Sequence, residues 1–218
     1  VEKVFEKTAD SGFPMNYIKS ISVSGQQHGL VALDSNGNLA RTMAKLWNDF
    51  STQEECDLLT DKLGGKENMI SETSNTQRTG YTAAKIYHMY RHERDIYNNT
   101  HILFLVHNYI NWYLTGGVAV MEPGDTSGTA LWNPATHNWS TDLISVIDPD
   151  LAEKLPKVRS STNSIGTISK SLAERFGFST ECKIDAGSGD NMYGAIGTGN
   201  VKPGIVTVSL GTSGTAYT

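Results

Sequence analysis

The sequence predicts a mixed α/β fold. Two runs rich in β-branched or apolar residues end in Gly, Ser and Thr, at 183–191 and at 204–215, as expected of strands that end in tight loops. Alternation of apolar and polar residues predicts further strands at 17–24 and 29–34. Helical segments lie between these strands, so strands and helices share one domain.

The first two predicted strands are joined by a bend that contains Gln27 and His28, and residues 35–38 close the second strand. Residues at strand ends in an α/β sheet commonly point into the ligand crevice. An isolated histidine more often bonds a nearby carbonyl group, so His28 by itself does not establish a binding site.

Two helices follow this bend in the sequence. Ser51 or Thr52 can cap a helix over 54–63, which the glycine pair at 64–65 ends. The next helix is predicted over 82–94.

His88 and His92 lie four residues apart on this second helix and could hold a metal ion on one face. The sequence offers no third ligand at a suitable spacing. We therefore expect no metal site and interpret both histidines as surface or packing residues.

The middle of the chain supplies core elements. Residues 101–114 predict a buried strand that runs into a helix, and 118–121 predict a short strand before the polar loop at 125–129. Trp132 and Trp139 follow, and core packing is the simpler interpretation of both than sugar stacking.

The last part of the chain continues the alternation. Ser140 can cap a helix, 165–166 predict a turn, and 167–176 predict a helix ended by glycine. A small-residue helix is expected over 191–199 and a last strand over 204–210. No internal repeat or long linker interrupts the chain, so we expect no domain boundary within it.

Composition excludes several classes of partner. The chain has 218 residues and a formal net charge of −5 with acids and bases intermixed, which argues against nucleic acid and anionic membranes. No apolar run is long enough to span a bilayer, and Cys56 and Cys182 lie far apart. A reduced, cytoplasmic setting is therefore expected.

The glycine-rich loops also suggest chemistry. Free backbone N–H groups in such loops suit phosphate, and Asp190 with Asn191 puts an acid beside an amide at the tip of the first loop. A proton acceptor next to an anion cradle indicates phosphoryl transfer to a hydroxyl group. Ordinary turns have the same composition, so this signal needs support from other motifs.

Three further motifs give that support: residues 22–29 with Gln-Gln-His-Gly, Leu-Trp-Asn-Asp at 46–49, and Leu-Thr-Gly-Gly at 114–117 followed by Asp-Thr-Ser-Gly-Thr at 125–129. In this order the chain resembles the FGGY carbohydrate kinases from about residue 17 to its end, and within them the xylulokinases. Gln-Gln-His-Gly is the most discriminating motif. The chain departs from the family's pattern at 106–108, where members often have Pro-Lys-Asp, and at His88, where many have Trp.

The resemblance implies an actin-like ATPase (ribonuclease H-like) domain, the N-terminal, sugar-binding half of a two-domain sugar kinase. The first strand hairpin, with its Asp-x-Gly-Thr phosphate loop, and the second, nucleotide-binding domain are not in the 218 residues. We therefore expect residues 1–218 to be a partial domain with little or no kinase activity alone. An unpaired sheet edge should make it a poor folding unit.

The activity implied is ATP-dependent phosphorylation of a pentulose, D-xylulose to D-xylulose 5-phosphate. By its match to the family's Gly-x-Asp-Asn motif, Asp190 is expected to be the catalytic base, with Gln27, His28 and Asn191 as substrate-binding residues. Asp185 is a rival acid to which we assign a structural role.

Further site residues are expected nearby. Trp47 and Asp49 are candidate substrate contacts, although core packing and loop capping remain equal alternatives for them. Gly211, Thr212 and Ser213 are expected to hold the phosphates of ATP, with Mg²⁺ offsetting their charge.

Two alternatives remain open at the level of sequence. The chain could belong to a kinase for another polyol or keto sugar of the ribulose, glycerol or gluconate type, or it could be a non-catalytic sugar-binding module. The expected partner in each case is a small-molecule sugar, and a homodimer of the complete enzyme is compatible with the resemblance.

Overall fold

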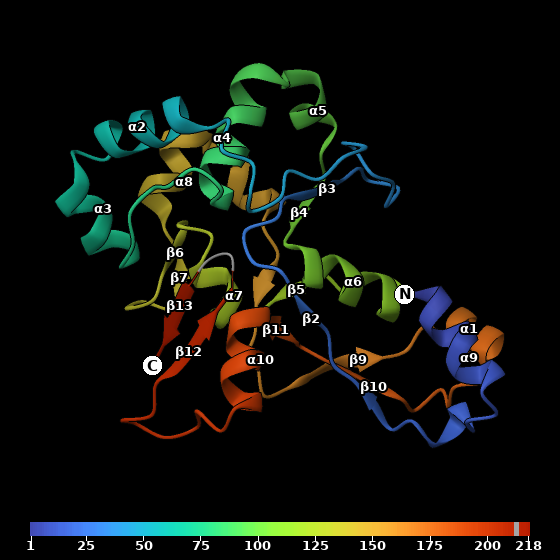
Figure 1. Cartoon of the computed structure of the whole chain (residues 1–218). Coiled ribbons are helices and arrows are strands. Elements are labelled where there is room, and N and C mark those ends of the chain that lie inside the picture. Colours follow the sequence, from blue (N-terminus) through green and yellow to red (C-terminus); the bar gives the residue numbers. More distant parts are fainter. Residues whose placement is uncertain (212–213) are drawn as a thin grey trace.

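The computed structural model describes residues 1–211 and 214–218 (Figure 1). Its helices, with two short 3₁₀ segments η1 and η2, are α1 (Glu2–Asp10), η1 (Met15–Tyr17), α2 (Gln53–Lys62), α3 (Lys66–Thr73), α4 (Thr82–His92), α5 (Arg94–Asn99), α6 (Val106–Thr115), α7 (Pro123–Ser127), α8 (Thr141–Ile147), η2 (Pro149–Lys154), α9 (Lys170–Phe176) and α10 (Asp190–Gly197).

The strands are short and are divided among several small sheets. They are β1 (Ser20–Ile21), β2 (Ser24–Gly25), β3 (Val31–Leu33), β4 (Ile102–Phe104), β5 (Val120–Met121), β6 (Trp132–Asn133), β7 (Asn138–Trp139), β8 (Lys157–Val158), β9 (Ser164–Thr167), β10 (Lys183–Asp185), β11 (Ser188–Gly189), β12 (Thr207–Leu210) and β13 (Gly214–Tyr217).

A parallel ribbon runs through the centre of the molecule. β1 pairs with β10, and farther along the same two segments β2 pairs with β11, with Ser24 opposite Ser188 and Gly25 opposite Gly189. Because parallel strands end at the same edge, the residues that follow Gly25 and Gly189 must lie side by side. β9 joins β10 on its other side as an antiparallel strand.

Two main apolar clusters lie in the molecule, and the second of them includes the ribbon. In Figure 1, α2, α3, α4 and α8 gather at one end of the molecule, where fully buried Leu59, Met69 and Leu143 form part of one cluster. At the other end, α1 and α9 lie against β9 and β10, and Ile184 and Phe176 belong to the second cluster.

Most of the elements predicted from sequence are present. The helix predicted over 82–94 is α4, and Ser140 caps α8 through its hydroxyl, which accepts a hydrogen bond from the Leu143 N–H. The turn predicted at 165–166 is wrong, because these residues lie inside β9. Pairing with β10 extends a segment whose glycine favoured a turn.

The last predicted strand is shorter than expected, because β12 begins at Thr207 rather than at 204. It forms an antiparallel hairpin with β13, in which Leu210 pairs with Gly214. The hairpin contacts the residues just after α10: the Thr198 hydroxyl bonds the Thr207 hydroxyl, and the Asn200 amide donates to the carbonyl of Tyr217.

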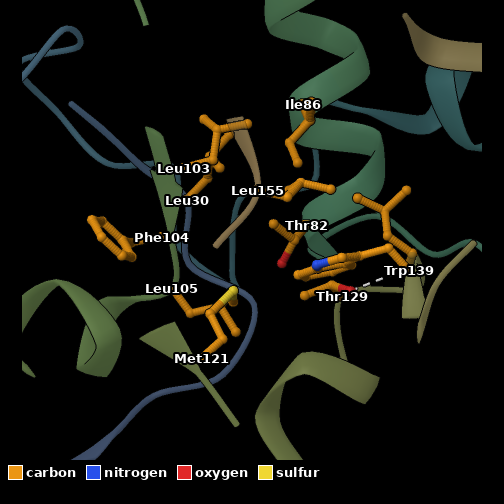
Figure 2. Close-up of a pocket in the computed structure, with 11 residues that line it drawn as sticks. Leu30, Thr82, Ile86, Leu103, Phe104, Leu105, Met121, Thr129, Trp139 and Leu155 are labelled. Atoms are coloured by element: carbon orange, nitrogen blue, oxygen red, sulfur yellow. Dashed lines mark hydrogen bonds between the residues drawn. The ribbon is translucent and has the colours of Figure 1, made fainter. Parts of the chain in front are cut away.

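Trp132 and Trp139 pack in the interior. Trp132 is 3% exposed, the two rings meet edge to face at 5.6 Å, and Trp139 Nε1 donates to the Pro156 carbonyl. Figure 2 shows Trp139 beside Thr129 and Leu155 at an apolar cavity of about 10 Å³, room for a single water molecule at most. This arrangement supports core packing rather than sugar stacking.

Within the described residues, no helix combines the length and apolar character that crossing a lipid bilayer requires.

Candidate active site

A polar cavity of about 300 Å³ opens where β2 and β11 end. Four segments line it: the bend after β2, the loop that holds Trp47, the start of α10, and the β12–β13 hairpin. The lining residues are Gln26, Gln27, His28, Trp47, Asp190, Asn191, Ser209 and Thr215. The parallel ribbon thus brings together most of the residues that the sequence singled out as a site.

Asp190 is the exposed acid of this cavity. It is the first residue of α10, where the N-terminal end of the helix dipole favours a negative charge. One carboxylate oxygen accepts the N–H of Asn191 at 2.9 Å, and no lysine or arginine forms an ion pair with Asp190 among the described residues. The carboxylate is therefore accessible to a ligand as a hydrogen-bond acceptor.

Two glycines allow the chain to reach this position. Gly187 has φ +73°, and a Cβ atom there would lie 2.4 Å from the Val23 carbonyl oxygen. A Cβ at Gly189 would lie 2.9 Å from Cγ of Gln27. Only glycine permits such close approach of the two segments, so the glycines before Asp190 are required by packing.

Gln27 and Asn191 link the two halves of the cavity. The Asn191 amide donates to the Gln27 side-chain oxygen at 2.9 Å, across a gap of 164 residues in the sequence. The bond fixes two amide groups on one wall of the cavity beside Asp190. Amides in this arrangement can both donate to and accept from a polyhydroxylated ligand.

His28 is held in an unusual backbone conformation with φ +63°. Its ring stacks on Tyr81 with 4.3 Å between ring centroids, and its Nδ1 lies 2.7 Å from the Gly128 carbonyl oxygen. Since a carbonyl only accepts, Nδ1 carries the proton and Nε2 is left as an acceptor. Burial lowers the pKa of His28, which keeps the ring neutral.

Lys85 holds the backbone of His28 through a hydrogen bond. This fully buried lysine on α4 donates to the His28 carbonyl at 2.7 Å and to the Gly80 carbonyl. Burial lowers the pKa of Lys85 to about 8, partly opposed by the attraction of Asp49. Lys85 thus couples α4 to the cavity, although it does not line it.

The free energy of unfolding should depend on pH through Lys85. The folded pKa, about 8, lies below the ordinary value of 10.5, so between these values the unfolded chain binds more protons. Stability should therefore rise with pH across this window, by about 3 kcal/mol at most. Urea unfolding of the wild type and of Lys85→Met from pH 7 to 11 measures this, because the variant should lack that slope; parallel curves would contradict the prediction.

A buried acid and histidine lie beneath the parallel ribbon. His107 Nδ1 is 2.8 Å from Asp125 Oδ2, and these side chains are 0% and 1% exposed. The Asn108 amide donates to His107 Nε2 at 2.9 Å, which leaves the ring proton on Nδ1, facing Asp125. Carbon atoms of His107 pack against Gly25 and Gly187, so this pair supports the strands that carry the cavity.

Trp47 and Asp49 lie in different environments. Trp47 lines the cavity and is 49% exposed. Asp49 is absent from its lining; its carboxylate accepts the Ser51 N–H at 3.0 Å and lies 3.1 Å from Lys45 Nζ. Burial opposes the shift, but these hydrogen bonds outweigh it and hold the pKa of Asp49 well below its usual range. The geometry favours loop capping for Asp49 over a substrate contact.

The remaining predicted residues are placed as follows. Asp185 ends β10, pairs with Ser164 across the sheet and does not line the cavity. Gly211 follows β12, next to the hairpin that forms one cavity wall, whereas Thr212 and Ser213 lie outside the described residues. Sequence reasoning missed Ser209 and Thr215, which line the cavity from paired positions of the hairpin.

Comparison with known proteins identifies the family. Residues 1–197 match the N-terminal domain of the FGGY family of carbohydrate kinases. The chain belongs to this family. Its fold is the actin-like ATPase fold of those sugar kinases, as the motifs in the sequence had implied.

Several xylulose kinases are similar to this FGGY chain. A xylulose kinase of Haemophilus influenzae is 42% identical over 207 residues, which cover 94% of this chain and 42% of that protein. One from Staphylococcus xylosus is 34% identical over 203 residues, covering 92% and 41%. The crystal structure of a xyloylose kinase from Brucella ovis superposes with a TM-score of 0.89 at 28% identity, covering 98% of this chain and 43% of that one. This FGGY chain therefore spans less than half the length of these relatives.

Proposed function

We propose that this chain is the sugar-binding part of a longer, ATP-dependent pentulose kinase that converts D-xylulose to D-xylulose 5-phosphate. One observation carries the proposal: the exposed carboxylate of Asp190 lies in the same polar cavity as Gln27 and His28. The xylulose kinases that are similar to the chain support this choice of sugar.

The chemistry follows from the cavity's donors and acceptors. Asp190 accepts the proton of the attacking hydroxyl as that oxygen bonds to phosphorus. Gln27 and Asn191 hydrogen-bond other hydroxyl groups, and His28 Nε2 accepts from one of them. Since a loose phosphoryl-transfer transition state demands little covalent chemistry of the protein, positioning and charge stabilisation dominate.

The donor phosphates have candidate partners on the hairpin. Ser209 and Thr215 line the cavity that contains Asp190, and hydroxyl and backbone N–H donors suit phosphate oxygens. Gly211 and the neighbouring Thr212 and Ser213 are proposed to complete this cradle. Mg²⁺ bound to ATP supplies charge neutralisation at the phosphates.

A sugar panel tests the proposal. The complete protein that carries this chain is incubated with ATP, Mg²⁺ and D-xylulose, D-ribulose, glycerol or gluconate, and ADP release is measured. We expect the highest kcat/KM with D-xylulose. Preference for another sugar would keep the kinase and replace the substrate, whereas no sugar-dependent ADP release would leave only a sugar-binding role.

His28 should make sugar binding depend on pH. Its Nε2 accepts from sugar only while the ring is neutral, and its pKa lies below the ordinary 6.5. We expect the KM for sugar to stay constant near pH 6.5 and to rise only at a lower pH, because the lowered pKa keeps the ring neutral there. His28→Asn tolerates the same positive φ but cannot titrate there, so its KM should be higher at pH 7.5 and should lack this acidic rise. An identical acidic rise in the variant would assign the effect to another group.

A further inference from the structure

A cluster of side chains with metal-ligating atoms lies apart from the cavity, where α2 packs against α4. Glu55 on α2 and His88 and His92 on α4 each offer one ligand atom, and these atoms all lie within 4.8 Å of one another. We propose that these three side chains bind a divalent transition-metal ion of the zinc type, with water completing its coordination.

The spacing within the cluster suits such an ion. Glu55 Oε2 lies 3.4 Å from His88 Nδ1, and Glu55 Oε1 lies 3.0 Å from His92 Nε2. Ligands about 2.1 Å from a tetrahedral ion are about 3.4 Å from one another. Each ring nitrogen therefore lies near this distance from one carboxylate oxygen of Glu55, His88 Nδ1 from Oε2 and His92 Nε2 from Oε1. The helical i, i+4 spacing of the histidines keeps both rings on the face of α4 toward Glu55.

Burial and an unpaired nitrogen both favour a ligand here. The side chain of Glu55 is 2% exposed, that of His88 22% and that of His92 45%. Among the described residues, no group makes a hydrogen bond of good geometry with the buried Nδ1 atom of His88. His92 leaves an open side through which an ion and its water molecule can enter. Two imidazoles with one carboxylate form a donor set used for zinc, whereas Mg²⁺ prefers oxygen ligands alone.

Arg91 competes with the ion for Glu55. Its two terminal nitrogens lie 2.7 Å from Glu55 Oε1 and 2.6 Å from Glu54 Oε1. Glu54 is 65% exposed and can keep the guanidinium when Glu55 turns to the metal. This competition predicts that removing the charge of Arg91 strengthens metal binding, an effect that a purely structural role of the cluster would not produce.

The neighbouring thiol is not expected to take part. Cys56 is buried next to Glu55 in sequence, but its sulfur is not among the three ligand atoms that lie within 4.8 Å of one another. The cobalt form of the site should therefore lack a thiolate-to-metal charge-transfer band, which separates this site from cysteine binding.

Co²⁺ titration of the purified full chain, followed by visible absorption and by displacement with Zn²⁺, tests the site. We expect a saturable band that an excess of Mg²⁺ does not remove. His92→Ala, at a half-exposed position that should fold, should weaken Co²⁺ at least about tenfold, the lower bound even for loss of an outer-shell partner. Arg91→Gln should tighten it, and His101→Ala, an exposed histidine outside the cluster, should leave it unchanged.

Three outcomes would overturn the proposal. These are the absence of a saturable band, the same affinity in His92→Ala as in the wild type, and loss of binding in His101→Ala equal to that in His92→Ala. None of them bears on sugar phosphorylation, because neither His92 nor Arg91 lines the cavity.

Discussion

Replacing Asp190 by Asn in the complete protein should lower sugar-dependent ATP turnover by about 10²–10⁴-fold, the usual contribution of a positioned general base. The amide keeps the size of the side chain but cannot accept the proton of the sugar hydroxyl. Sugar affinity should change little, because Gln27, His28 and Asn191 remain. Steady-state kinetics and calorimetric titration with D-xylulose measure the two quantities separately.

The matched control is Asp185→Asn, five residues earlier on β10. Asp185 pairs with Ser164 across the sheet and does not line the cavity, so sugar-dependent ATP turnover should stay close to that of the wild type. Any decrease should be no larger than a small loss of stability causes. Wild-type turnover in Asp190→Asn would remove Asp190 as the base, and a larger loss in Asp185→Asn would transfer that role to Asp185.

His107→Leu should destabilise the folded chain by about 3–5 kcal/mol at pH 7, because it leaves the Asp125 carboxylate buried without its partner. Denaturant unfolding of the wild type and the variant at pH 7 measures this loss.

The double variant His107→Leu with Asp125→Leu removes both polar groups. It should be more stable than His107→Leu alone, since no unpaired charge remains buried. If the two variants are equally unstable, the cost belongs to the shape of the imidazole against Gly25 and Gly187, and the explanation by an unpaired buried carboxylate fails.

Local patterns in the sequence predicted individual elements but not their pairing. The residue type of Ser140 and its place before a helical segment predict an N-cap, and Ser140 does cap α8. The sequence around Ile165 and Gly166 looks like a turn, yet β10 draws it into β9. That outcome depends on a strand almost twenty residues away, and no local propensity contains it.

The same limit applies to the candidate site. The glycine loop around Asp190 and the bend at His28 can be found in the sequence by composition and motif. The two loops lie close together in the fold because Gly25 and Gly189 pair in parallel register, and sequence periodicity does not specify that register. Glu55 was overlooked as a partner of His88 for this reason, since it approaches from a different helix.

The restraint of His28 from several sides has a thermodynamic consequence. Lys85 holds its carbonyl, Gly128 holds its ring nitrogen, and Tyr81 covers its face. Because this hydrogen-bond acceptor is already fixed in place, the protein loses little conformational entropy when a sugar binds to it. Ordering of His28 therefore reduces the binding free energy little. The binding enthalpy measured by calorimetric titration should then reflect mainly the exchange of water for hydroxyl contacts. Lys85→Met removes the hydrogen bond to the His28 carbonyl, so sugar binding to this variant should have a less favourable entropy.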